Sequence, residues 1–243
     1  MDNRYIWSVP PRTLELAEDV VHVWRASLNL EKEALDRCAS ILSQDEKHRA
    51  SRFLIPRDRD HFVAARGVLR DLLGKYAARS PALLEFRYGQ HGKPALREEH
   101  GKSPVHFNLS HSGGLAVYAF ARNRELGIDL EPIRPKFAGE NIAERYFSLG
   151  ELEEWNRLAP ELRAKAFSLC WTRKEAYVKA RGEGLQIPLD SFSVTLTPGQ
   201  PEELRSSDSA RWRLHSFEPE PEYVAALVGE GTDWRPAQWD WQP

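Results

Sequence analysis

Two apolar stretches flank a short polar segment near the middle of the chain. Leu115 to Phe120 is a continuous apolar run, and residues 126, 128 and 130 form a second run with a period of two. The charged segment 122–125 between them has the composition of a turn. We therefore predict an antiparallel hairpin, which would bring the end of the second strand beside the start of the first.

Two acidic residues occupy alternate positions of the second strand. Asp129 and Glu131 share one face, while the apolar residues of this strand point to the other. In the hairpin, Glu131 would lie near the loop that carries Ser110 and His111. Two carboxylates on one face repel each other, so a bound divalent cation would stabilise the pair, and oxygen ligands suit Mg²⁺.

The rest of the pattern predicts helices and strands in both halves of the chain. Helices are expected at 31–53, 56–78 and 162–181. Further strands are expected at 20–24, 86–88, 105–107, 191–196, 211–217 and 223–228. Each half combines a short strand, helices and about three strands, so we assign the chain to the α+β class. This pattern is compatible with an internal duplication, although no repeat is visible at the level of residues.

Composition narrows the class of protein further. Hydrophobic residues make up 41% of the chain, which is enough for a core and excludes wholesale disorder. The 34 basic and 36 acidic residues give a formal charge of −2, so nothing in the total charge favours nucleic acid or an anionic membrane. No apolar stretch approaches the ~20 residues of a transmembrane helix.

Two cysteines and the N-terminal sequence indicate the cellular compartment. Cys38 and Cys170 lie far apart, and residues 1–4 lack a signal-peptide pattern. We therefore expect a cytoplasmic protein with two reduced thiols. The tryptophan-rich tail, 234–241, could be a packing strap or a partner surface, and the burial usual for terminal aromatics favours the strap.

The predicted helix 162–181 carries a polar stripe. Trp171, Glu175 and Lys179 follow one another at intervals of four residues, and Lys174 flanks them. An exposed Glu–Lys pair that adds about 0.3–0.5 kcal/mol to the helix would explain this spacing. The tryptophan in the stripe and the glycine-rich stop at 182–184 favour instead a partly buried face that a ligand can approach.

Several motifs together resemble the Sfp-type 4′-phosphopantetheinyl transferases. Singly they are weak, and a lone Gly92-Lys93-Pro94 is most often just a turn. The matching segments, in their order along the chain, are Gly92-Lys93-Pro94, 107–113, 127–131, 171–179 with Gly182 and Gly184, and 185–192. Because order and spacing agree from residue 92 to residue 192, chance agreement is a poor explanation.

The resemblance implies an enzyme that acts on coenzyme A. It would transfer the 4′-phosphopantetheine arm to a serine of an apo acyl or peptidyl carrier protein and release adenosine 3′,5′-bisphosphate. By this likeness Asp129, Glu131 and Glu175 hold Mg²⁺. Glu175 would also accept the serine proton, and Lys179 would stabilise or protonate the leaving bisphosphate.

The same resemblance implies a set of contacts to coenzyme A. Ser110 and His111 would contact the 3′-phosphate, and Lys93 would line the adenine and phosphate pocket. Lys47, Arg66 and Lys174 are further expected contacts. The first-helix stretch is one residue shorter than in well-known members, so other basic residues of 57–70 could compensate. These candidates are Arg57, Arg59, His61 and Arg70.

The fold implied by the family has two similar α+β halves related by a pseudo-two-fold axis, with the cofactor between them. Residues 1–121 would supply the nucleotide contacts, and residues 122–243 would supply the metal and catalytic residues. The length suggests the monomeric type, and the carrier protein served is not evident. A metal-dependent phosphodiester hydrolase and a non-catalytic binder of coenzyme A or of a carrier protein are the alternatives.

Overall fold

The computed structural model describes residues 7–97, 105–134 and 140–243. Its helices are α1 (Lys32–Ser40), α2 (Gln44–Ser51), α3 (Pro56–Ala77), α4 (Glu140–Tyr146), α5 (Leu149–Arg157) and α6 (Pro160–Arg181). Its strands are β1 (Val20–Ser27), β2 (Phe86–Tyr88), β3 (Pro94–Leu96), β4 (Val105–Ser112), β5 (Leu115–Arg122), β6 (Leu126–Pro132), β7 (Ser193–Val194), β8 (Leu204–Arg205), β9 (Trp212–Phe217), β10 (Tyr223–Glu230) and β11 (Arg235–Asp240). None of the helices within these ranges is long and apolar enough to cross a membrane.

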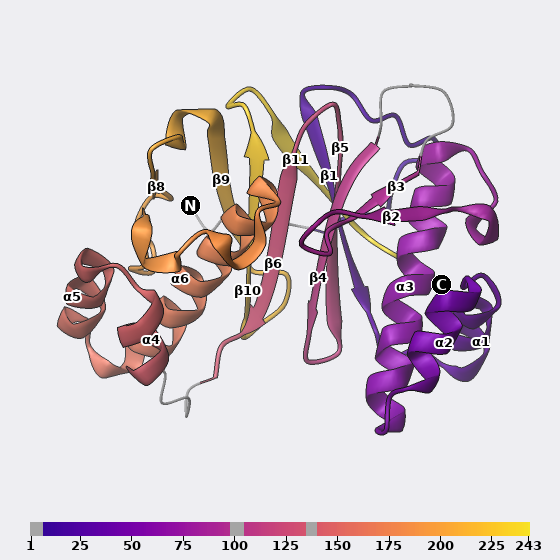
Figure 1. The fold of residues 1–243 in the computed structure, drawn as a ribbon, viewed down its shortest axis with the longest axis horizontal. Helices are drawn as coiled ribbons and strands as arrows, with labels where there is room; N and C mark the ends of the chain where they lie inside the picture. Colours follow the sequence, from indigo (N-terminus) through magenta and orange to yellow (C-terminus); the bar gives the residue numbers. More distant parts are fainter. Residues whose placement is uncertain (1–6, 98–104, 135–139) are drawn as a thin grey trace.

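Two sheets form the centre of the molecule. One has the strand order β11-β1-β5-β4 and the other the order β6-β10-β9. Figure 1 shows them between two groups of helices, α1–α3 on one side and α4–α6 on the other. The predicted α+β class is therefore confirmed.

The two sheets share an apolar core. Side chains of β1 and β5 pack with those of β6 and β10, and the cluster includes Val23, Val117, Ile128 and Leu227. All four are fully buried. The alternation of apolar residues in β6 thus serves the junction between the two sheets and leaves its acids facing away from this core.

The predicted hairpin between the two central apolar runs is wrong. β5 pairs antiparallel with β4 and β1, whereas β6 pairs antiparallel with β10. The true hairpin joins β4 to β5 through Gly113 and Gly114, whose φ angles of 60° and 90° suit glycine. The polar segment 123–125 leads instead from one sheet to the other.

The predicted helix 31–53 is two helices, α1 and α2. The break comes before Ser43, whose side chain and that of Glu46 form a capping box that starts α2. The helices predicted at 56–78 and 162–181 correspond to α3 and α6.

The tryptophan-rich tail is a packing strap, as predicted. β11 runs parallel to β1, and the Trp239 ring lies 5.2 Å from that of Trp24 between centroids. Trp241 donates a hydrogen bond from Nε1 to Asp71, 2.8 Å away. The last strand therefore joins the sheet of the first half, across the expected division after residue 121.

Candidate active site

β4 and β6 lie side by side and are joined by side chains. Asn108 Oδ1 accepts a hydrogen bond from the backbone N–H of Ile128 at 2.9 Å. Two positions further along β4, Ser110 Oγ donates to Asp129 at 2.9 Å. Glu131 is thus brought near the segment of Ser110, as expected, although by side-chain contacts between strands of two different sheets and not by the predicted hairpin.

A glycine brings β6 against α6. A Cβ atom built on Gly127 would lie 2.2 Å from the carbonyl oxygen of Ala176 and 2.3 Å from the backbone nitrogen of Ala180. Only glycine permits this approach, because any side chain would meet helix backbone. The acids of β6 consequently stand next to the polar stripe of α6.

Lys179 lies at the centre of this junction. Its ammonium donates to Asp129 Oδ1 at 2.6 Å, to the carbonyl oxygen of Ile128 at 3.2 Å and to Ser110 Oγ at 3.3 Å. The Asp129 side chain is 6% exposed and that of Lys179 is 29% exposed. The structure therefore brings together a lysine, an acid and a serine from three separate elements.

Glu131 and Glu175 share the electrostatic field of Asp129. Burial raises the pKa of Glu131, and the negative charge of Asp129 raises it further. The pKa of Glu175 is raised by the same two effects, in the same order. Because both carboxyl groups resist ionisation, a cation at this place would stabilise their charged forms.

The residues expected to hold a metal suit a hard divalent cation. Asp129 Oδ2 is buried and, among the described residues, has no hydrogen-bond partner. An unpartnered carboxylate oxygen that acts electrostatically on two carboxyl groups of raised pKa is a fitting donor for Mg²⁺. Within the described ranges, however, no three His, Cys, Asp or Glu side chains converge as a preformed metal cluster.

Positive charge gathers near His111. Desolvation lowers the pKa of this histidine, and the charges of Lys179, His61 and Arg49 lower it further. His61 Nε2 lies 2.9 Å from Asn29 Oδ1, and Asn29 in turn contacts the β4–β5 turn. Basic side chains from α2, α3, β4 and α6 therefore share one region, where an anionic ligand would be stabilised.

Sequence reasoning missed Arg49. The capping box at the start of α2 was the signal that could have found it, since Arg49 lies three residues after the inward-facing Glu46 and so on the same side of the helix. Its guanidinium lies 5.2 Å from the ring centroid of Phe62 in α3.

The comparison with known proteins agrees with this geometry. Residues 24–123 match the family described as 4′-phosphopantetheinyl transferase, N-terminal, and residues 125–228 match the 4′-phosphopantetheinyl transferase superfamily. The 4′-phosphopantetheinyl transferase HetI of Nostoc sp. is 39% identical over 236 residues, which are 97% of this chain and 98% of that protein. The chain belongs to the 4′-phosphopantetheinyl transferase superfamily.

Other relatives are consistent with this membership. The putative 4′-phosphopantetheinyl transferase slr0495 of Synechocystis sp. is 34% identical over 73% of this chain and 72% of its own length. The 4′-phosphopantetheinyl transferase Sfp of Bacillus subtilis is 29% identical over 84% of this chain and 89% of its own. The chain is therefore a transferase, and neither the hydrolase nor the non-catalytic binder describes it.

Two arginines of this transferase are held in a buried ion pair. Arg66 Nε donates to Glu46 at 2.6 Å, and Arg70 Nε donates to the second oxygen of the same carboxylate at 2.5 Å. Burial alone would raise the pKa of Glu46, but the two arginines lower it overall. One carboxylate balances only one of these two positive charges, so the expected contact between Arg66 and a phosphate stays a prediction.

The remaining basic candidates are exposed. Arg57 and Arg59 pair with the neighbouring Asp58 and Asp60 on the surface of α3. Lys47 is also exposed, on α2. Its contact to the cofactor stays a prediction.

Lys174 serves the core of the transferase and does not reach a ligand. Its side chain is fully buried, and its ammonium lies 2.7 Å from the carboxylate of Glu151. It also donates to the carbonyl oxygens of Leu189 and Phe192 at 2.6 and 2.7 Å. The prediction that Lys174 binds the cofactor is wrong, because every donor of the ammonium faces protein.

Lys93 is also engaged within the protein. Its ammonium donates to Glu125 Oε2 at 3.0 Å, to the carbonyl oxygen of Leu126 at 3.0 Å and to that of Ala180 at 3.4 Å. An ammonium has three donors. The residue lines a pocket with Tyr88 and His106, and its place in the adenine and phosphate pocket stays a prediction.

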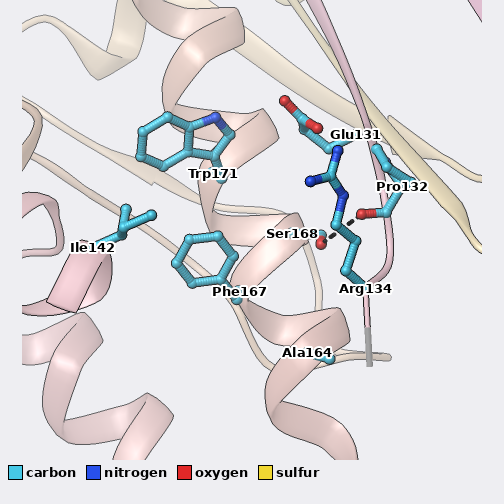
Figure 2. Close-up of a pocket in the computed structure, with 8 residues that line it drawn as sticks. All are labelled: Glu131, Pro132, Arg134, Ile142, Ala164, Phe167, Ser168 and Trp171. Carbon is cyan, nitrogen blue, oxygen red and sulfur yellow. Dashed lines mark hydrogen bonds between the residues drawn. The ribbon is translucent and has the colours of Figure 1, made fainter. Parts of the chain in front are cut away.

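A second pocket opens beside Glu131 and was not foreseen from the sequence. Figure 2 shows its residues, which are Glu131, Pro132, Arg134, Ile142, Ala164, Phe167, Ser168 and Trp171. Trp171 stacks on Phe167 with ring centroids 6.1 Å apart. The half-buried tryptophan of the α6 stripe thus forms an apolar wall next to a carboxylate.

Proposed function

We propose that this transferase moves the 4′-phosphopantetheine arm of coenzyme A onto a serine hydroxyl of an apo acyl or peptidyl carrier protein. Adenosine 3′,5′-bisphosphate is the second product. The observation that carries the proposal is the junction of Ser110, Asp129 and Lys179, with Glu131 and Glu175 beside it. This junction offers a hydroxyl from β4, acids from β6 and α6 and a cation from α6 at one place, as transfer of a phosphoryl group between two oxygens requires.

Asp129, Glu131 and Glu175 are the proposed ligands of Mg²⁺. The unpartnered Oδ2 of Asp129 and the raised pKa values of the two glutamates support this assignment. When bound, Mg²⁺ would neutralise the charge of the pyrophosphate.

Glu175 is the proposed base for the carrier serine. A serine hydroxyl is a weak nucleophile unless a base takes its proton. Glu175 stands four residues before Lys179 on α6, so the proposed base and the cation for the leaving group come from one face of the helix.

Lys179 is proposed to stabilise the departing bisphosphate. Asp129 holds its ammonium at 2.6 Å, which fixes the position of the charge before any substrate arrives. A preset cation of this kind stabilises developing negative charge without the cost of reorganising water.

The nucleotide end of coenzyme A is proposed to lie near His111. Arg49, whose charge acts on His111, is the residue we add to the expected 3′-phosphate contacts Ser110, His111, Lys47 and Arg66. His61, whose charge also acts on His111, is the candidate that we favour from the 57–70 set. Arginine and histidine suit a phosphate by charge and by hydrogen bonding. The uncharged pantetheine arm would then lie along the pocket of Figure 2, beside Phe167 and Trp171.

We further propose that the protein acts as a cytoplasmic monomer without a nucleic-acid or membrane partner. The near balance of 34 basic and 36 acidic residues supports the last two points.

Mass spectrometry of intact carriers tests the proposal. The protein is incubated with coenzyme A, Mg²⁺ and a panel of apo carrier proteins of the fatty-acid, polyketide and peptide-synthetase types. We expect at least one carrier to gain the mass of phosphopantetheine on its serine, and a serine-to-alanine carrier to gain none. Release of adenosine bisphosphate with no carrier modified would contradict the proposal.

A further inference from the structure

The ammonium of Lys93 joins three elements that are distant in the sequence. Lys93 directly precedes β3, and its backbone is fixed in the β2–β3 turn because its carbonyl oxygen accepts from Gly89 N–H at 2.9 Å. Its side chain crosses to the start of β6, at Glu125 and Leu126, and to Ala180 at the end of α6. One side chain therefore connects the β2–β3 hairpin (86–96) with the two elements that carry the acids and Lys179.

The bond to Ala180 is favourable for the helix. Its carbonyl belongs to the last turn of α6, where backbone oxygens have no partner in the helix and a cation is stabilised by the helix dipole. The side-chain Cδ of Lys93 lies 3.8 Å from a Cβ built on Gly182, the left-handed residue that ends α6. Lys93 therefore satisfies an acceptor that the helix leaves open.

A second contact seats the hairpin on the same turn. A Cβ built on Gly184 would lie 2.9 Å from Cβ of His91, the residue two positions before Lys93. Gly184 has a φ of 59°, so the backbone after α6 bends in a way that leaves room for His91. The hairpin tip thus packs on the end of α6 as well as hydrogen-bonding to it.

Glu125 is the anionic partner in this arrangement. One of its carboxylate oxygens lies 3.1 Å from His106 Nδ1, and the other lies 3.0 Å from the Lys93 ammonium. The hydrogen bond from His106 and the charge of Lys93 lower the pKa of Glu125 to about 2 although burial opposes them. The carboxylate accordingly stays charged at neutral pH and keeps Lys93 in place.

We infer that Lys93 is a positioning residue, a latch that fixes the β2–β3 hairpin and the start of β6 against the end of α6, and that its charge does not contact a phosphate of the nucleotide. The inference rests on the proposed function in one respect, since it concerns the placement of Asp129 and Lys179 for that reaction. Asp129 lies three residues after Leu126, and Lys179 directly precedes Ala180. An ammonium that binds both carbonyls therefore sets the distance between these two active residues.

Hydrogen–deuterium exchange of the substrate-free protein tests the latch directly. Lys93→Met removes the donors at similar length, and Glu125→Gln removes the charge of the partner. In both variants we expect amides of 86–96 and 181–184 to exchange about tenfold faster, equivalent to about 1.4 kcal/mol of local opening. Lys165→Met, which removes the surface ion pair with Glu218, is the matched control and should leave these amides unchanged. Unchanged exchange in Lys93→Met would overturn the inference.

The double variant and the kinetics separate the latch from a phosphate contact. If Lys93 and Glu125 act as one unit, the amides of the double variant Lys93→Met/Glu125→Gln exchange no faster than those of the faster single variant. Additive increases in the exchange rate would show that the two residues act separately. The latch predicts that Lys93→Met lowers kcat and leaves the preference for coenzyme A over dephospho-coenzyme A unchanged. Loss of that preference would overturn it. Because the exchange experiment uses no substrate, it decides the latch even if no carrier is modified.

Discussion

Asn108 and Lys179 hold Ile128 from opposite ends of its backbone. Asn108 Oδ1 accepts from the N–H of Ile128 at 2.9 Å, and the Lys179 ammonium donates to its carbonyl oxygen at 3.2 Å. Ile128 directly precedes Asp129. The position of the central acid is therefore fixed through the main chain by side chains of β4 and α6, in addition to its own contacts.

Removal of the Asn108 amide should destabilise the protein. In Asn108→Ala the buried N–H of Ile128 loses its acceptor, so we expect the free energy of unfolding to fall by about 1–3 kcal/mol. Urea denaturation measures the change. Ser112→Ala is the control. Among the described residues the hydroxyl of Ser112 makes only a 3.4 Å contact with Glu131, so its loss should cost less than about 0.5 kcal/mol. Equal losses in the two variants would contradict the role of Asn108.

Loss of the Glu175 carboxylate should affect activity far more than stability. Glu175→Gln removes the proposed base, so carrier modification should slow by about 10²–10⁴-fold. The unfolding free energy should change by less than about 1 kcal/mol, because the variant also removes repulsion with Asp129. Glu153→Gln on the surface of α5 is the control for both measurements. Near-normal transfer by Glu175→Gln would show that the base is misassigned.

The cations near His111 should matter only when the 3′-phosphate is present. His111→Ala and Arg49→Ala should each lower kcat/KM for coenzyme A by about 10–100-fold, mainly through KM, since each removes a charge-assisted contact. Dephospho-coenzyme A should be used equally well by both variants and the unaltered protein. The control is Arg52→Ala, because Arg52 is exposed at the end of α2, the helix that also carries Arg49. Equal losses with both substrates would argue against a 3′-phosphate site here.

An added methyl group at Gly127 should separate β6 from α6. Its Cβ would lie 2.2 Å from backbone, so Gly127→Ala should cost at least about 2 kcal/mol of unfolding free energy and reduce transfer. The matched control is Gly150→Ala in α5, where a Cβ meets no described atom within 4 Å. Alanine favours a helix over glycine by up to about 1 kcal/mol, so this variant should be neutral or stabilised. The midpoints of chemical denaturation compare the two, and equal midpoints would contradict the close approach.

His22 should make stability depend on pH. It is 3% exposed, and burial, followed by the charge of Arg235, lowers its pKa to about 4. Tyr76 hydroxyl accepts from Trp24 Nε1 at 2.8 Å and so is free to donate to His22 Nδ1, also at 2.8 Å, which favours the neutral ring.

The direction of this pH dependence follows from the different pKa of His22 in the folded and the unfolded chain. Between pH 6.5 and 4 the unfolded chain binds a proton at His22 that the folded chain does not, so the unfolding free energy falls as the pH falls. The loss of unfolding free energy that His22 causes reaches about 3 kcal/mol at pH 4. His22→Gln should show a shallower decline over this window in denaturation at successive pH values. Identical slopes would exclude His22 as the cause.

Local patterns in the sequence predicted the elements better than their partners. The two strands 115–120 and 126–130 exist, and Asp129 and Glu131 do flank the same junction. Their predicted pairing failed because β5 is a central strand, buried between β1 and β4. The adjacent glycines at 113 and 114 were the better hairpin signal, since two-residue turns often require positive φ angles.

Charge alone could not identify the ligand-binding residues. Arg66, Lys93 and Lys174 all carry the charge that a phosphate needs, but each is paired inside the protein. Their acidic partners lie 20 or more residues away in the sequence, so no local pattern marks the pairing. Arg49, in contrast, remains exposed and near His111, which only the packing of α2 on α3 makes visible.

The parallel pairing of β11 with β1 has a consequence for the order of synthesis. The ribosome makes β1 long before β11, so one edge of β1 stays open until β11 has been synthesised. The first sheet can be completed only when residues 235–240 have emerged, and Arg25 then pairs with Asp240 at 2.5 Å. The sheet of the first half is thus completed by a strand that is made after the second half, and a segment that stops before β11 would lack this edge strand.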